Sequence, residues 1–310
     1  MLPPSMMPFY MQRRTLMMGM LAAGAGMAVA LRPSPGSVPP GLIPFGAYDP
    51  AGDFADETDF TIEHVFLPWE DVAITSLFDA DRYAMDRNRA LLVTLEPWTW
   101  SRSERNTARA LRDGIADGAY DATMRSICEV LAALNSPLTL RWGHEMDDDN
   151  GQFIWAGWRP DDYIAAYRRM MDIARDAVPG INLMWSPLGD AGMEDYYPGD
   201  DYVDLTGLSV FGLQAWDRAN YNRDRSFAEI LEPRYARAET FGKPIVVAEL
   251  GYSGDAAYVA AWNNAVRSQA AQFPALVGVV YFNYPEVYDW PQGFGRPDWR
   301  IGDRIVTIAS

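Results

Sequence analysis

The chain has 310 residues, of which 49% are hydrophobic, and it carries a formal net charge of −16. This length and apolar content suffice for the core of one large domain. The acidic balance argues against a nucleic-acid partner, because phosphate groups would be repelled, whereas a neutral polymer would be unaffected.

The first thirty residues have the features of an export signal. Arg13 and Arg14 precede an apolar run at 16–30 that ends in small residues. This pattern predicts a twin-arginine-like signal peptide at 1–30, a Pro-, Ser- and Gly-rich linker at 31–41 and one domain at 42–310. The run is short for a membrane span, although an uncleaved N-terminal anchor is the alternative. We expect a periplasmic or secreted protein with no stable membrane insertion after signal cleavage.

Beyond residue 42, short apolar runs alternate with helical patterns. The apolar runs predict eight strands, at 42–48, 60–68, 90–95, 137–142, 181–185, 203–211, 244–249 and 276–282. Helical spacing occurs at 73–87, 103–111, 122–134, 161–177, 226–240 and 255–273. Eight strands separated mostly by helices predict parallel pairing with helical crossovers, and hence an α/β fold, a single-domain (β/α)8 barrel. The competing open sheet needs a glycine-rich phosphate turn after the first strand, and this chain has none there.

Acidic residues end several of the predicted strands, where a barrel of this kind places its catalytic groups. Arg141, His144 and Glu145 close the fourth strand, and Glu249 closes the seventh. Two carboxyl groups on facing strands suit the hydrolysis of a glycosidic bond, with one as nucleophile and the other as acid/base. Two further strand-end carboxyl groups are rivals for either role, namely Glu96 and Glu286.

Other chemistries find less support in the residues. His144 and Glu145 begin like a zinc-protease helix, but position 148 is Asp148 and the only other histidine is His64. The acidic run at 147–151 departs from the calcium-loop pattern, and no serine nucleophile elbow is complete. We therefore expect no metal and no cofactor.

Several motifs resemble glycoside hydrolase family 26, whose best-known members are β-mannanases. They follow the family's order: Arg-Trp-Gly-His-Glu-Met at 141–146, Asn-Gly at 150–151 with Trp155, Trp-Ser-Pro at 185–187, and the segments 197–204, 207–210 and 243–251. The resemblance implies a (β/α)8 barrel that hydrolyses with retention by double displacement. It implies that Glu145 is the acid/base, that Glu249 is the nucleophile, and that His144 contacts the reacting sugar while Arg141 holds the family's arginine position.

Three departures from the family pattern lie around the catalytic pair. The tyrosine that the family has after the sixth strand is Phe211, which has no hydroxyl to donate to the nucleophile; this should raise that group's pKa. Three aspartates at 147–149 are inserted in the fourth-strand motif, and the aromatic run after them becomes Gln-Phe-Ile-Trp at 152–155. These changes bear on the sugar that is bound.

We therefore expect a monomeric retaining hydrolase of a β-linked polysaccharide, specifically an endo-β-1,4-mannanase. A mixed-linkage β-glucanase and an exopolysaccharide-processing hydrolase are the alternatives within this class, and a catalytically weak carbohydrate-binding barrel is the alternative outside it. Aromatic rings offer faces on which sugars stack. The expected substrate contacts are Arg141, His144, Trp98, Trp155, Phe211 and Trp290.

Overall fold

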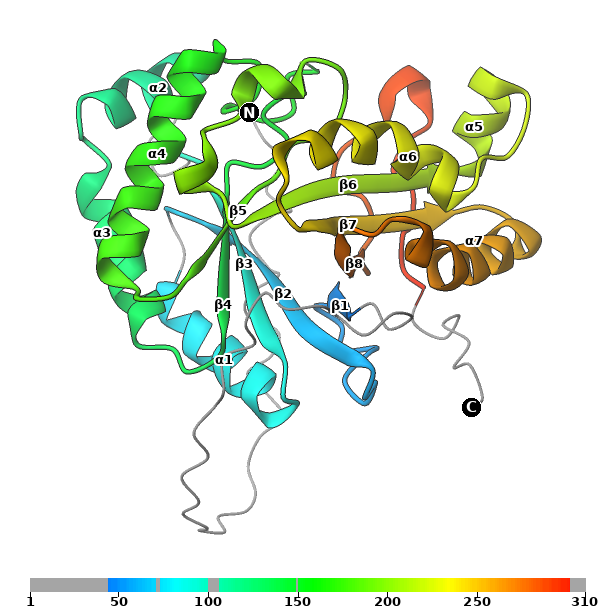
Figure 1. Ribbon diagram of the computed structural model, residues 1–310, viewed down its shortest axis with the longest axis horizontal. Coiled ribbons are helices and arrows are strands. Elements are labelled where there is room, and N and C mark those ends of the chain that lie inside the picture. The colour runs from blue at the N-terminus through cyan, green and yellow to red at the C-terminus, as the bar shows by residue number, and fades with distance from the viewer. Residues whose placement is uncertain (1–43, 71–72, 100–105, 149, 302–310) are drawn as a thin grey trace, which may run out of the picture. The chain divides into compact units, whose positions relative to one another are not determined.

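Eight parallel strands close into a barrel in which each strand pairs with its neighbours in chain order and β1 pairs with β8. The computed structural model describes residues 44–301 except 71–72, 100–105 and 149 (Figure 1). The strands are β1 (Phe45–Tyr48), β2 (Phe60–Pro68), β3 (Ala90–Glu96), β4 (Leu138–Trp142), β5 (Asn182–Trp185), β6 (Leu205–Leu213), β7 (Ile245–Ser253) and β8 (Leu276–Phe282). The predicted (β/α)8 barrel is confirmed. The signal peptide and the linker lie outside the described residues and stay predictions.

Helices cover the outside of the barrel (Figure 1). They are α1 (Leu77–Asp86), α2 (Ala108–Ala116), α3 (Asp121–Ala132), α4 (Pro160–Ala177), α5 (Gln214–Tyr221), α6 (Phe227–Ala238) and α7 (Ala256–Gln269). Short 3-10 turns are η3 (Ile74–Ser76), η5 (Met193–Tyr196), η6 (Asp200–Tyr202), η7 (Glu239–Phe241), η8 (Ala270–Gln272) and η9 (Pro291–Gly293). Across the described ranges, none of these helices has the length and apolarity needed to cross a lipid bilayer.

The observed helices differ from the predicted ones at two places. The start of the helix predicted at 103–111 lies outside the described residues; α2 begins after Thr107, which caps it, its hydroxyl accepting a hydrogen bond from the Ala110 N–H at 3.1 Å, and the helix runs on past the predicted end to Ala116. Helix α5 was not predicted, since two helical turns carry too little periodicity to stand out. It ends at Asn222, whose left-handed backbone (φ 55°) stops the helix.

The inside of the barrel changes from apolar to polar toward the carboxyl ends of the strands. Its lower part is filled by a small cluster of Leu92, Met184, Val246, Ala248 and Val280. Side chains alternate along a strand, so Thr94 and Glu96 face the same side of β3 as Leu92. Thr94 and Glu96, which follow Leu92 on β3, therefore lie nearer the carboxyl end of the barrel, its mouth, than the buried apolar cluster.

A larger apolar core lies between the barrel and its helices. On β4 the residues Leu138, Leu140 and Trp142 belong to it, together with Leu131 of α3 and Met170 of α4. Burying one such side chain contributes about 1.5–3 kcal/mol of transfer free energy. This packing fixes which face of β4 points outward, and so it directs the intervening residue, Arg141, into the barrel.

Candidate active site

Arg141 is the buried centre of the site, with no exposed surface. Its guanidinium donates three hydrogen bonds: from Nε to Ser186 Oγ at 2.8 Å, and from Nη1 to Thr94 Oγ1 at 3.3 Å and to Glu249 Oε1 at 2.6 Å. A guanidinium is planar, so the bonds from Nε to Ser186, directly after β5, and from Nη1 to Thr94 on β3 fix its plane, and the same Nη1 atom then also donates to the carboxylate on β7.

Glu249 reaches this position through an irregularity in β7. Leu208 and Ser209 are consecutive on β6, but they pair with Val247 and Glu249, which leaves Ala248 as an extra residue. A bulge of this kind re-aims the side chains next to it. Ala248 packs in the interior cluster, and Glu249 follows it into the barrel although strict alternation would turn Glu249 outward.

Glu145 follows β4 and has a left-handed backbone, with φ 53°, which is uncommon outside glycine. Such a conformation costs on the order of 1–3 kcal/mol and persists only where the surroundings hold it. Here the Glu145 N–H donates to the Ser186 carbonyl at 2.8 Å, and the Ser209 hydroxyl donates to its carboxyl group. Because Ser209 is the register partner of Glu249, this contact brings the two carboxyl groups to the same part of the mouth.

Ser186 contacts both Arg141, the partner of Glu249, and the backbone of Glu145, and the sequence assigned it no role in the site. Its hydroxyl accepts from Arg141, and its carbonyl accepts from the Glu145 N–H. A Cβ at Gly207 would lie 2.5 Å from the Ser186 hydroxyl, so the neighbouring strand leaves room for it by carrying glycine. The sequence signals were its place at a strand end and its position in the Trp-Ser-Pro motif at 185–187, and neither indicates which groups it contacts.

Burial and neighbouring charges shift the ionisation of this cluster. Burial, and after it the charge of Glu249, raise the pKa of Glu145 to about 8. Burial also raises the pKa of Glu249, and the Arg141 guanidinium opposes that rise by charge and by its hydrogen bond. Burial and the Arg141 cation lower the pKa of His64 and His144, so both imidazoles are neutral at pH 7.

His144 lies beside the pair, with its Nε2 atom 3.8 Å from Glu249 Oε1. Its carbonyl accepts a hydrogen bond from Trp155 Nε1 at 2.7 Å, and its ring packs edge-on against Phe153 at 4.9 Å. Trp155 is fully buried and Trp98 is 4% exposed, with their ring centroids 4.8 Å apart. These two tryptophans therefore form a wall behind His144, and in this structure their faces are not open to a sugar.

The two rival carboxyl groups have different surroundings. Burial, and then the charge of Glu249, raise the pKa of Glu96 to about 7, so this carboxyl belongs to the same electrostatic cluster. Glu286 also acts on the cluster, since its charge contributes to the raised pKa of Glu249, and it accepts N–H groups from the segment after β8, including Trp290 Nε1 at 3.4 Å and Trp299 Nε1 at 3.1 Å. Its hydrogen bonds order that segment beside the mouth.

The acidic run after Glu145 is partly explained by its contacts. Asp147 is half-buried in the loop and accepts the backbone N–H groups of Leu188, Gly189 and Asp190 at 2.6, 3.0 and 3.3 Å. Burial raises the pKa of this carboxyl group. Asp147 therefore holds the segment after β5 against the segment after β4.

No group of three or more His, Cys, Asp or Glu side chains in the described ranges is arranged to hold a metal ion.

The remaining predicted contacts lie at the edge of the mouth. Phe211 is half-buried near the end of β6, where its ring lies over Gly251 and packs against Trp299 with centroids 5.0 Å apart. Trp290 is also half-buried and lies 6.4 Å from Phe211, between ring centroids. The structure thus brings Arg141, His144 and the two glutamates together, with Phe211 and Trp290 on the rim.

The fold and the site together define a class. Catalytic groups of (β/α)8 barrels lie at the carboxyl ends of the strands, and a pair of nearby carboxyl groups there suits the cleavage of a glycosidic bond. The arrangement is that of a glycoside hydrolase barrel.

Comparison with known proteins agrees with this class. The sequence model of Glycosyl hydrolase family 26 matches residues 110–272, which is more than half of the chain, and the chain belongs to this family. The resemblance drawn from the motifs is thereby confirmed.

Individual relatives differ in their substrates. The chain is 26% identical to endoglucanase H of Acetivibrio thermocellus over 269 residues, which cover 80% of this chain and 27% of that protein. It is 28% identical to a mannan endo-1,4-β-mannosidase of Bacillus subtilis over 177 residues, 53% of this chain and 42% of that protein. The chain thus spans between about a quarter and two fifths of the length of these relatives.

The fold is also found in solved structures. GH26C from Muricauda sp. MAR_2010_75 superposes with a TM-score of 0.60 over 79% of this chain and 80% of that chain, at 15% sequence identity. At this identity the likeness concerns the fold alone.

Proposed function

We propose that this chain is a retaining glycoside hydrolase of a β-linked polysaccharide, with Glu249 as the nucleophile and Glu145 as the acid/base. The observation that carries the assignment is the asymmetry of the two buried carboxyl groups. Arg141 donates a charge-assisted hydrogen bond to Glu249 alone, which favours its ionised form. Burial and the charge of Glu249 raise the pKa of Glu145 to about 8 although the Ser209 hydroxyl donates to it, and this favours the protonated form near neutrality.

These two states fit a double displacement. A Glu249 oxygen attacks the anomeric carbon while Glu145 gives its proton to the departing glycosidic oxygen. Glu145 is then ionised and takes a proton from water, whose oxygen attacks the same carbon and releases Glu249. Arg141 keeps Glu249 oriented through both steps, and neutral His144 lies close enough to contact the reacting sugar.

We expect kcat/KM to fall above about pH 8, because Glu145 must be protonated to act as the acid and its pKa is raised to about 8. Burial places the pKa of Glu249 above its ordinary value of 4.5, so the rising limb, where the nucleophile ionises, lies above that pH. The measurement is kcat/KM of the wild type against pH on two substrates, an oligosaccharide whose leaving group needs a proton and an aryl β-glycoside whose leaving group needs none. The alkaline limb should appear on the oligosaccharide and be absent from the aryl β-glycoside, on which Glu145→Gln should behave as the wild type does. An alkaline limb of equal size on both substrates would contradict the assignment.

For the substrate we propose a β-1,4-linked mannan, supported by membership of family 26 and by the likeness to a mannan endo-1,4-β-mannosidase. The likeness to an endoglucanase supports mixed-linkage β-glucan as the second candidate. The test is product release by residues 31–310 from β-mannan, glucomannan, mixed-linkage glucan, β-1,3-xylan and cellulose. Release from mannans above the other polymers is the expected result, and a preference for mixed-linkage glucan would replace mannan as the substrate.

A catalytically weak carbohydrate-binding barrel is the second function, and Phe211 is the residue that favours it. The tyrosine that the family has at this position donates a hydrogen bond to the nucleophile, whereas the ring of Phe211 has no hydroxyl with which to do so. Binding of a polymer without product release, by a folded chain, would support this function. From the N-terminal pattern we also propose that the protein is exported. We further propose, as a separate point, that it acts as a monomer.

A further inference from the structure

We infer that Trp216 and Tyr221 form a further sugar-binding subsite, which holds units of the polysaccharide beyond those at the catalytic pair. The inference rests on the proposed function. Both residues belong to α5, which begins directly after β6 and so lies at the mouth end of the barrel (Figure 1). Tyr221 is 47% exposed, one of three large hydrophobic side chains that reach this exposure class in the described part of the chain.

A continuous line of rings connects this helix to the site. Phe211 lies on the rim, and its ring centroid is 6.4 Å from that of Trp290. Trp290 is in turn 6.4 Å from Trp216, and Trp216 is 5.6 Å from Tyr221. Phe211, Trp290 and Trp216 are half-buried, and the line ends in the exposed ring of Tyr221. Grouped exposed aromatic residues mark binding surfaces, and stacking on rings suits the apolar faces of sugars.

The rings at the outer end are held from behind by a cation. The Arg225 guanidinium lies 4.0 Å from the ring centroid of Tyr221 and 5.2 Å from that of Trp216. Arg225 is itself fixed by Asp217, a fully buried carboxylate 2.9 Å away, which also accepts a hydrogen bond from the Tyr258 hydroxyl. A platform that is ordered before binding loses less conformational entropy when a ligand arrives.

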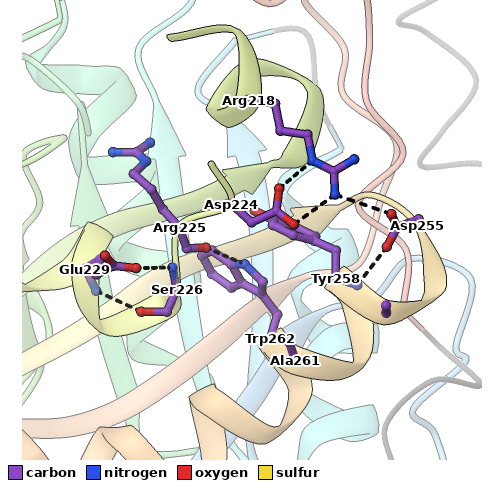
Figure 2. A pocket seen from close by; sticks show the side chains of 10 residues that line it. Arg218, Asp224, Arg225, Ser226, Glu229, Asp255, Tyr258, Ala261 and Trp262 are labelled. Carbon is purple, nitrogen blue, oxygen red and sulfur yellow. Dashed lines mark hydrogen bonds and ion pairs between the residues drawn. The ribbon is translucent and has the colours of Figure 1, made fainter. Parts of the chain in front are cut away.

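The chain between α5 and α6 is also held in place. A pocket of about 340 Å³ lies beside it. Figure 2 shows residues that line it: Arg218 pairs with Asp224 at 2.6 Å, and Trp262 Nε1 donates to the Arg225 carbonyl at 3.0 Å. Arg218 also pairs with Asp255 at 3.6 Å (Figure 2), whereas Arg225 pairs with Asp217 and Glu229 pairs with Arg223. The contacts around the pocket therefore hold the segment that follows α5 in place. The binding surface that we infer is formed by the rings of Trp216 and Tyr221 on α5.

The occupant is a neutral polysaccharide rather than an isolated sugar or a protein. The ring line is continuous with the catalytic mouth, so a chain bound across Glu249 and Glu145 can extend along it. The cation behind the rings is already paired with Asp217, which leaves no free charge to select an anionic ligand. Remote contacts of this kind improve the binding of long substrates and leave the reacting centre unchanged.

The test compares a long and a short substrate in Trp216→Ala and Tyr221→Ala. We expect KM for soluble β-mannan or mixed-linkage β-glucan to rise about five- to tenfold, with kcat and the hydrolysis of an aryl β-glycoside unchanged. Trp216→Phe, which keeps a ring, should restore most of the affinity. Phe78→Ala is the matched control, because Phe78 is an aromatic residue 39% exposed on α1, outside the ring line, and its loss should change neither substrate.

Binding is measured separately in the Glu249→Gln background by affinity electrophoresis in gels that contain either polymer. Loss of retardation in the Trp216→Ala form, with the Phe78→Ala form still retarded, supports the subsite even if the wild-type chain releases no product. Equal retardation of all forms, absence of retardation by both polymers, or an equal loss on the short substrate overturns it. Thermal denaturation of each variant separates a loss of binding from a loss of folded protein.

Discussion

Glu249→Gln is expected to lower kcat by at least about 10⁴-fold, because the amide cannot attack the anomeric carbon. The substitution keeps the size of the side chain, and the amide oxygen can still accept the hydrogen bond that Arg141 Nη1 donates at 2.6 Å. We therefore expect the variant to fold and to bind polysaccharide as the wild type does. The measurement is the initial rate of product release together with affinity electrophoresis.

Smaller substitutions identify which carboxyl group has which role. In Glu249→Ala and Glu145→Ala, an added anion such as azide can enter the space that the side chain leaves. Glu249→Ala should then give a glycosyl azide of inverted configuration, and Glu145→Ala one of retained configuration, because only the second still forms the covalent intermediate. The opposite pair of configurations would exchange the two roles. Rescue in Glu96→Ala instead of either variant would give the role to the rival carboxyl group.

Arg141→Met is expected to lower kcat/KM by about 10²- to 10³-fold, because the ionised nucleophile loses its cation in a buried site. The same change leaves Glu249 buried and unpaired, which should cost about 3–5 kcal/mol of folding free energy. Arg141 opposes the rise in the pKa of Glu249, so its removal raises that pKa further. The rising limb of the pH profile should therefore move to higher pH, which is measured as kcat/KM against pH.

Two variants grade the effect of Arg141. Arg141→Lys keeps the charge but loses the planar fork that reaches Ser186, Thr94 and Glu249 together, so its activity should lie between Arg141→Met and the wild type. Ser186→Ala removes one of the two hydroxyl groups that aim the fork and should cause a smaller shift of the same limb. A pH profile that is identical in all four proteins would show that Arg141 does not control the nucleophile.

The barrel and the ends of its strands could be predicted because both depend on local patterns in short stretches of sequence. Apolar runs of strand length, spaced by helical patterns, identify eight parallel strands. Glu145 and Glu249 each follow such a run, so their placement at one end of the barrel follows from chain direction alone. The helix α5 and the braced tyrosine at its end were missed, because two turns without a clear apolar face carry little signal.

The sequence by itself determined the class of fold, the acidic mouth and the family, since each rests on local patterns and on the order of motifs. Only the tertiary structure decided how the groups in the mouth meet. Arg141 and Glu249 are 108 positions apart, and their contact depends on the register of β6 against β7 and on the extra residue Ala248 in that pairing. A shift of one residue reverses the face of every side chain that follows, and no local periodicity reports it. For the same reason the role of Ser186, whose hydroxyl accepts from Arg141 and whose carbonyl accepts from the Glu145 N–H, became visible only in the folded barrel.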